Sequence, residues 1–203
     1  QFMKNKILLL LTVAMVALNF TCLTLNSFAQ HKHFWGLTRG GGLPGGGSIF
    51  EWEPSDTMIV GRYGFFYNSE TGNGPLGSLT QLGDKFYGMT FSGGINGKGV
   101  IFEFDPAGEG TYTNDGEGTY TTKHKFIHEN AGGAGTNGPC GSLTVLAGKL
   151  YGMTRYGGKY DKGVIFEFDP TGEGTYTKKH DFDSINGAVA FGDLTLSGGK
   201  FYG

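Results

Sequence analysis

The chain has 203 residues, of which 39 are glycine, 17 phenylalanine and 10 tyrosine. Glycine normally contributes roughly 7% of a protein, and an aromatic content of 14% argues against intrinsic disorder. Only 17% of the residues are charged and the net charge is -2, so nothing indicates a nucleic-acid partner. Two cysteines are too few for a disulfide framework. The composition therefore favours a glycine-rich, aromatic-rich β protein.

The N-terminal segment has the layout of a secretory signal peptide. The chain contains no glycine before Gly36, and a short basic start precedes an apolar run over residues 7–18. Ser27-Phe28-Ala29 then forms a small-x-small cleavage site, so we expect residues 1–29 to be the signal. Gln1-Phe2 precedes the plausible start at Met3 and is interpreted as an upstream extension.

Two alternatives to a cleaved signal remain open. An uncleaved membrane anchor would use the apolar residues that continue to Leu25, and a lipid-modified N-terminus would use Cys22. Cleavage after Ala29 leaves Cys140 as the only cysteine, which we expect to be a buried, inert thiol. The predicted location is the extracellular space or the outer cell surface, with the periplasm as the alternative.

Three short signatures recur in fixed order after the signal. They are aromatic-Gly-Met/Leu-Thr, then Ile-Phe-Glu-aromatic-acid-Pro, then Gly-Ser/Asp-Leu-Thr. Their copies lie at 35–38, 87–90 and 151–154, at 49–54, 101–106 and 165–170, and at 77–80, 141–144 and 192–195. The middle copy is lengthened by a local duplication within 108–121. The underlying period of about 51 to 56 residues indicates a tandem repeat.

Each period predicts four short antiparallel strands. In the copy that begins at Gly141 we expect strands at 143–146, 150–154, 163–169 and 175–182, separated by glycine and proline turns. No segment after the signal has helical periodicity. The fold class expected for 34–203 is therefore all-β, with kelch-like β-propeller blades of four strands.

The expected blades cover 35–86, 87–150 and 151–201, with a truncated fourth copy at 202–203. Three blades are fewer than a closed propeller needs, so we expect an incomplete, open arc. In the first copy, the fourth strand near 58–66 lacks the Thr-Tyr-Thr pattern. Because no anchor sequence follows Gly203, the sequence is interpreted as a fragment of a longer chain.

The order of these signatures resembles the GloVer-type tandem repeat, over residues 34–203. This resemblance implies export from a Gram-negative bacterium and a repeat fold. It implies neither a defined activity nor catalytic residues. The first copy departs from the pattern, since it also lacks the histidine of the later His-x-Phe motif.

The repeated acids Glu51, Glu103 and Glu167 are the most informative polar positions. Each lies between two aromatic residues, so on a strand it faces away from them. One interpretation is a ring of carboxylates that binds a cation or sugar hydroxyls. The favoured one is a structural role, in which each acid accepts backbone N–H bonds from a neighbouring blade, because every copy has it.

Residues that differ between copies are better candidates for ligand contact. Arg155, Tyr156 and Tyr160 occupy a loop between the second and third strands of their copy. His124 and His128 have a spacing that can hold zinc, but a structural role is favoured for His124 because His180 repeats it. We expect no catalytic residue, metal site or cofactor.

The predicted function is an exported repeat protein that serves as a binding or scaffold module. The expected partner is a carbohydrate or another surface protein, and membrane contact is expected only through the signal or a C-terminal anchor. The alternative is a fragment of a secreted propeller enzyme that acts on glycans through acids such as Glu103 and Glu167. An enzyme is disfavoured but left open.

Overall fold

The computed structural model describes residues 33–43, 45–68, 70–109, 117–127 and 138–203. Over these residues the protein consists of β-strands, turns and loops, without a helix. The predicted all-β class is confirmed for this part of the chain. The predicted signal at 1–29, with Cys22, lies outside the described residues.

Strands follow one another in chain order within each antiparallel sheet. The first blade contains β1 (Phe34–Thr38), β2 (Ser48–Trp52) and β3 (Val60–Gly64); the second contains β4 (Thr80–Leu82), β5 (Lys85–Met89), β6 (Val100–Glu109) and β7 (Glu117–Lys125); the third contains β8 (Thr144–Leu146), β9 (Lys149–Met153), β10 (Val164–Asp169) and β11 (Thr175–Asp181). A terminal hairpin of β12 (Thr195–Ser197) and β13 (Lys200–Tyr202) completes the described strands.

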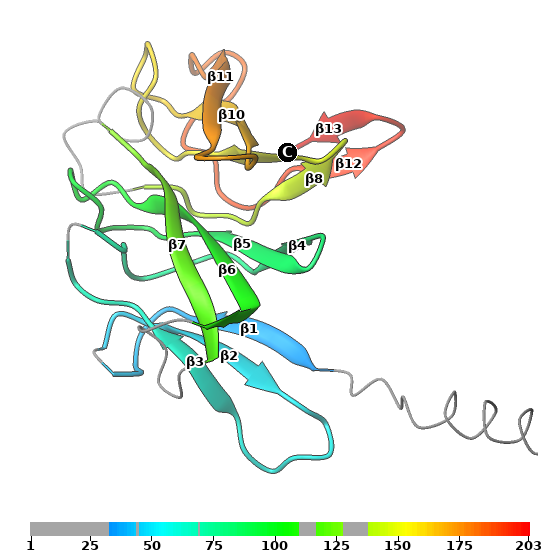
Figure 1. Cartoon of the computed structure of the whole chain (residues 1–203). Helices are drawn as coiled ribbons and strands as arrows, with labels where there is room; N and C mark the ends of the chain where they lie inside the picture. Colours follow the sequence, from blue (N-terminus) through cyan, green and yellow to red (C-terminus); the bar gives the residue numbers. More distant parts are fainter. Residues whose placement is uncertain (1–32, 44, 69, 110–116, 128–137) are drawn as a thin grey trace, which may run out of the picture.

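The blades stack in an open series. Figure 1 shows the first blade and the terminal hairpin at opposite ends of the stack, with the second blade between the first and the third. No described sheet closes into a barrel, so the protein forms an open arc of propeller-like blades. The sequence periods that start at residues 35, 87 and 151 begin inside β1, β5 and β9. The second and third sheets therefore take their first strands, β4 and β8, from the end of the preceding period.

A glycine beneath a phenyl ring recurs in every blade. The glycine of the first signature pairs with the phenylalanine of the second in all three sheets: Gly36 with Phe50, Gly88 with Phe102 and Gly152 with Phe166. A Cβ added to Gly88 would lie 2.4 Å from Phe102 Cζ. The ring thus occupies the space that any side chain at this position would need, a known way of supporting glycine in a sheet.

The threonine of the first signature closes the loop between the second and third strands. Thr90 Oγ1 accepts a hydrogen bond of 3.0 Å from the backbone N–H of Val100, and Thr154 Oγ1 accepts one of 3.1 Å from Val164. Thr38 and Ser48 form the same bond in the first blade. Because both threonines of the later blades are buried, the bond satisfies groups that water does not reach.

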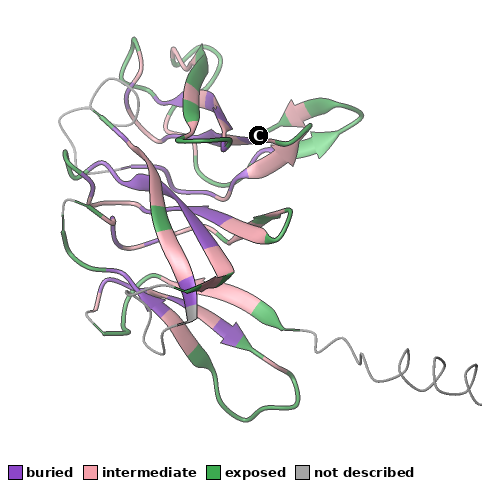
Figure 2. Ribbon diagram, in the orientation of Figure 1, coloured by how far each residue is buried: buried purple, intermediate pink, exposed green. Residues whose placement is uncertain are grey.

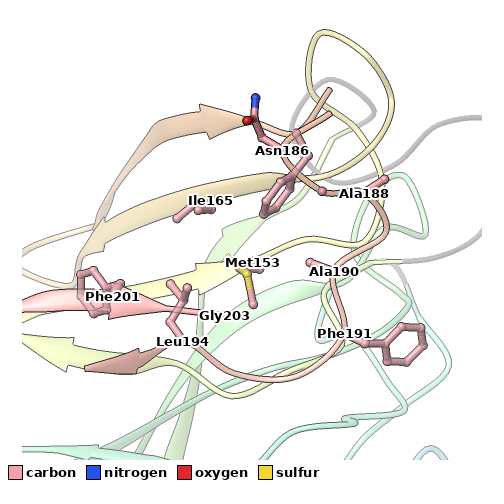
Figure 3. Close-up of a pocket in the computed structure, with 11 residues that line it drawn as sticks. Met153, Ile165, Asn186, Ala188, Ala190, Phe191, Leu194, Phe201 and Gly203 are labelled. Atoms are coloured by element: carbon pink, nitrogen blue, oxygen red, sulfur yellow. The ribbon is translucent and has the colours of Figure 1, made fainter. Parts of the chain in front are cut away.

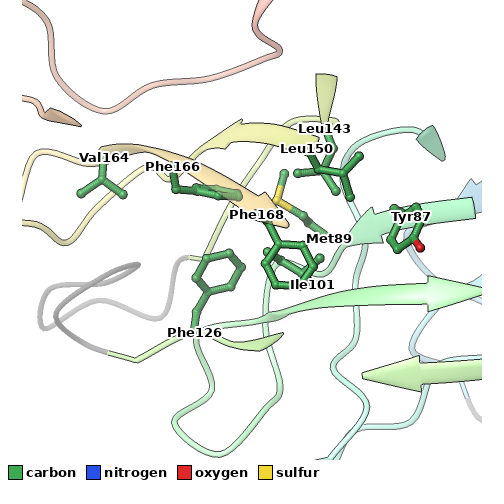
Figure 4. Close-up of a cluster of buried hydrophobic side chains, with 9 residues drawn as sticks. All are labelled: Tyr87, Met89, Ile101, Phe126, Leu143, Leu150, Val164, Phe166 and Phe168. Atoms are coloured by element: carbon green, nitrogen blue, oxygen red, sulfur yellow. The ribbon is translucent and has the colours of Figure 1, made fainter. Parts of the chain in front are cut away.

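Two apolar clusters hold the blades together. One lies between the first and second blades and contains Ile49, Tyr63, Phe65, Val100, Phe102 and Phe104. The other lies between the second and third blades and contains Tyr87, Met89, Ile101, Phe126, Leu143, Leu150, Val164, Phe166 and Phe168 (Figure 4). Burial is concentrated at these interfaces, while the hairpin tips are exposed (Figure 2). Burying this apolar area is the main force that stacks the blades.

The first strands of successive blades are joined by their Gly-Ser/Asp-Leu-Thr signature. Thr80 Oγ1 donates to the carbonyl of Leu143 at 2.7 Å, and the N–H of Ser78 donates to Ser142 Oγ at 2.8 Å. Thr144 and Ser142 make the corresponding bonds to Leu194 and Asp193 of the terminal hairpin segment. The third signature is therefore explained by contacts between blades.

We expect Gly88→Ala to destabilise the protein by about 1–3 kcal/mol, because the methyl group must displace the buried Phe102 ring. Gly40→Ala is the matched control, since a Cβ at Gly40 meets nothing within 4 Å. Urea unfolding of the two variants measures the difference. Equal midpoints for the two variants would contradict the role given to the Gly88–Phe102 contact.

Candidate functional site

The repeated acids are held by side chains of their own blades. Glu103 accepts hydrogen bonds of 2.6 Å from both Lys85 Nζ and Tyr87 Oη. Glu167 accepts bonds of 2.7 Å from Lys149 Nζ and Tyr151 Oη. These partners differ from the expected backbone N–H groups of a neighbouring blade. The lysine and the tyrosine lie two residues apart on the adjacent strand, so both reach the same face as the acid.

The first blade binds its acid differently. Trp35 stands where the later blades have tyrosine and pairs with Glu51 across the sheet. Arg62 compensates, because its Nε and a terminal nitrogen lie 2.7 and 2.6 Å from Glu51 Oε2. His33 Nδ1 contacts the other carboxylate oxygen. A planar guanidinium that binds a carboxylate through two nitrogens is a strong charge-assisted pair.

A β-bulge brings a further cation to each acid. The register between the strand that carries the acid (β2, β6 or β10) and the strand that follows it (β3, β7 or β11) shifts at the same place in all three blades. The shift lies immediately before the phenylalanine that precedes the acid. The extra residues on the fourth strands are Arg62, Lys123 and Lys179. Lys179 Nζ lies 3.5 Å from Glu167 Oε2. Bulges commonly re-aim a side chain in this way.

These contacts keep the two later acids ionised. Burial opposes ionisation of Glu103, but the hydrogen bonds from Lys85 and Tyr87 outweigh it and lower its pKa. The bond from Lys149, helped by Tyr151, lowers the pKa of Glu167 to about 2. A general acid for glycoside cleavage needs a carboxyl group with a raised pKa. The contacts of Glu103 and Glu167 therefore favour the ionised carboxylate over the protonated form that a general acid needs.

A cleft of about 460 Å³ lies beside the acid of the second blade. Lys85, Tyr87, Glu103 and Lys123 line one side, and turns of the third blade around Gly148 and at 170–172 line the other. Lys123 donates a hydrogen bond across the cleft to the carbonyl of Gly172. Lys123 therefore joins the second blade to the third.

His124 packs within the interface between the second and third blades. Its ring is stacked on Tyr176 at 4.6 Å between centroids and meets the edge of Phe126 at 5.0 Å. Burial lowers the pKa of His124 to about 4. His180 and Phe182 have the same edge-on contact in the third blade. His128, the other half of the candidate zinc pair, lies outside the described residues.

The candidate contact loop of the third blade carries cations placed over aromatic rings. The Arg155 guanidinium lies 5.3 Å from the ring centre of Tyr156 and 4.5 Å from that of Phe191. Lys159 Nζ lies 5.0 Å from the ring centre of Tyr160, which is exposed. Such pairs hold the aromatic rings at the surface. The structure brings Arg155 and Tyr156 together and adds Phe191, which sequence spacing did not connect to them.

Cys140 is buried, and burial raises the pKa of its thiol despite the opposing charge of Arg155. Its location agrees with the expected inert thiol. Among the described residues no three His, Cys, Asp or Glu side chains gather as metal ligands. No helix in the described part of the chain is long and apolar enough to span a membrane.

The sequence pattern did not lead us to expect the basic side chains that bind Glu51, Glu103 and Glu167. One signal was present, because a lysine precedes the tyrosine by two residues at Lys85, Lys149 and Lys200. The basic residue at the bulge was harder to recognise in the sequence. Arg62 belongs to the first copy, whose fourth strand lacks the Thr-Tyr-Thr pattern of the later copies.

We expect Glu103→Gln to lower the free energy of unfolding by about 1.5–3 kcal/mol, the usual contribution of hydrogen bonds to a charged group. Glu109→Gln makes the same change at an exposed end of β6 and should alter stability by no more than about 0.5 kcal/mol. Chemical unfolding at neutral pH measures both. Equal stability of the two variants would show that the Glu103 cluster contributes little to the fold.

His124 predicts a pH dependence of stability. Between pH 6.5 and 4 the unfolded chain protonates His124 while the folded chain does not, so stability falls as the pH falls, by up to about 1.4 kcal/mol per unit. We expect His124→Phe to reduce the pH dependence of stability. His180→Phe, at an exposed position, should reduce it less. Unfolding between pH 7.5 and 5 measures the slope above the range in which Glu103 and Glu167 titrate. Identical slopes in both variants would rule out His124 as its source.

Comparison with known families agrees with the repeated signatures and the stacked blades. The Gloeobacter/Verrucomicrobia repeat model matches residues 21–203, slightly more than the 34–203 expected from the resemblance. No curated protein matches the chain. No solved structure matches it either. The match covers most of the chain, which therefore belongs to the Gloeobacter/Verrucomicrobia repeat family.

Proposed function

We propose that the protein is an exported binding or scaffold module of a Gram-negative bacterium, located outside the cell or on its surface. The layout of residues 1–29 supports export, and the kelch-like size of the blades suits a framework that presents loops. The ligand class we propose is a carbohydrate, with another surface protein as the alternative.

One observation carries this proposal. The loop at 155–160 presents two tyrosines and two cations, whereas the equivalent loop of the second blade contains Phe91, Ser92, Ile95 and Asn96. Repeated positions are accounted for by packing and ion pairs within the fold, so this difference between copies requires another explanation. Tyrosine and arginine are the residue types that most often anchor a partner at a binding surface.

The alternative, a propeller enzyme that acts on glycans, finds less support. Its acids would be Glu103 and Glu167, which lie in the same structural position of successive blades. Both have lowered pKa values because lysine and tyrosine side chains bind the ionised form. Neither is suited to donate a proton to a leaving group.

A glycan array probed with the full chain tests the proposal. We expect binding of at least one glycan class, weakened about tenfold by Tyr160→Ala, as for loss of an anchoring aromatic residue. Ile95→Ala, at an exposed position in the equivalent loop of the second blade, is the matched control.

Binding that is unchanged in Tyr160→Ala would contradict the assignment of this loop. Release of product from a glycan, lost in Glu103→Gln or Glu167→Gln, would instead establish the enzyme. Absence of binding to every glycan would reject the carbohydrate ligand.

A further inference from the structure

The loop between β9 and β10, residues 154–163, concentrates positive charge. It contains Arg155, Lys159 and Lys162 but only one acid, Asp161, so it has a net charge of +2 in a chain whose net charge is -2. The side chains of Lys159 and Lys162 are exposed, and Arg155 is half-buried. The loop is therefore a basic patch on an otherwise slightly acidic protein.

The fold does not neutralise these three charges. Six basic side chains on the strands form ion pairs with acids, and they are Arg62, Lys85, Lys125, Lys149, Lys178 and Lys179. In contrast, Arg155, Lys159 and Lys162 form no ion pair with any residue that the structure describes. The carboxylate of Asp161 accepts a hydrogen bond of 2.9 Å from the N–H of Gly157, which places it inside the turn.

Arg155 is held by aromatic rings instead of an acid. Its guanidinium lies over Tyr156 and Phe191, and its buried Nε has no hydrogen-bond acceptor among the described residues. Phe191 belongs to the wall of a neighbouring cavity of about 270 Å³, and Figure 3 shows its ring turned away from Met153 and Leu194. The rings thus orient the guanidinium without using its hydrogen-bonding capacity.

The loop backbone is ordered by hydrogen bonds of its own. The N–H of Gly163 donates to the carbonyl of Gly157 at 3.1 Å, and the N–H of Lys159 donates to Asp181 Oδ1 at 2.7 Å. Asp181 also forms an ion pair with Lys178, so its charge is already matched. A loop that is ordered before binding loses less conformational entropy when a ligand binds.

We propose that this loop binds an acidic polysaccharide, whose sugar units carry carboxylate or sulfate groups. This inference rests on the carbohydrate ligand proposed above and specifies its charge. A guanidinium group presents N–H donors in a geometry that matches planar anionic groups such as carboxylates. Tyrosine adds an apolar ring face with a polar hydroxyl, which suits contact with a sugar ring.

The residue types of the loop favour a glycan over a lipid surface. Residues 154–163 contain Tyr156 and Tyr160 but no Leu, Ile, Val, Met, Phe or Trp. Protein segments that lie on a membrane combine basic residues with such apolar side chains, which insert among the lipids. Tyr160 is 48% exposed, so part of its ring is accessible beside the Lys159 ammonium group.

Two matched pairs of polymers test the proposal with the full chain. One pair is polygalacturonate and its methyl ester, and the other is dextran sulfate and dextran. We expect at least one acidic polymer to bind at least about tenfold more tightly than its neutral counterpart. We also expect this binding to weaken as sodium chloride is added, because salt screens exposed charges.

Charge reversals locate the binding. Lys159→Glu and Lys162→Glu, each at an exposed position of the loop, should weaken it about tenfold. Lys200→Glu is the matched control, because it makes the same change at an exposed position of the terminal hairpin. Figure 1 shows this hairpin on the side of the stack opposite the loop. Lys200→Glu should bind as the unaltered chain does. Circular dichroism verifies that each variant is folded.

The outcomes separate this inference from the proposed function. Equal binding of each acidic polymer and its neutral counterpart would overturn the acidic ligand and still support a carbohydrate-binding module. Binding to none of the four polymers would overturn the inference, while the glycan array decides on other carbohydrates. Binding that neither Lys159→Glu nor Lys162→Glu weakens would overturn the assignment to this loop. Binding to phosphatidylglycerol vesicles alone, lost in both variants, would assign the loop to a lipid surface instead.

Discussion

The contact between a phenyl ring and a glycine on the adjacent strand is the constraint on which the rest of the structure depends. The ring of Phe102 fills the space over Gly88, and no larger residue fits there. Since side chains on a strand alternate between faces, this contact determines which residues of β6 face the first blade and which face the third. Phe102 and Phe104 face the first, and Glu103 and Ile101 face the third. A shift of one residue would exchange the two sets.

The two faces of each blade therefore make different contacts. One presents the aromatic side chains of its third strand to the preceding blade. The other presents an apolar half and, nearer the hairpin turn, a carboxylate that lysine and tyrosine bind in the two later blades and Arg62 binds in the first. The carboxylate makes the strand register more specific. In the wrong register the acid would be buried without its cation, which costs far more free energy than the loss of a contact at the surface.

Most of the strand positions followed from the sequence. The strand expected at 163–169 is observed as β10 (Val164–Asp169), and the one expected at 175–182 as β11 (Thr175–Asp181). The first copy was harder, since its fourth strand was expected near 58–66 and is limited to β3 (Val60–Gly64). The alternation that separates Glu103 from its aromatic neighbours was also predictable, because it depends only on the geometry of a strand.

The sequence by itself determined the repeat, the β class, the strand order within a copy and the positions that recur. These depend on local chemistry: alternating side chains, glycine turns and the period of the signatures. The partners of the recurring residues were decided only by the tertiary structure. A bulge brings Lys179 toward Glu167, and the blade interface stacks His124 on Tyr176. The folded chain also places Phe191 beneath Arg155. Each of these contacts joins residues from different strands or loops, so its geometry depends on how sheets twist and pack, which spacing along the chain does not specify.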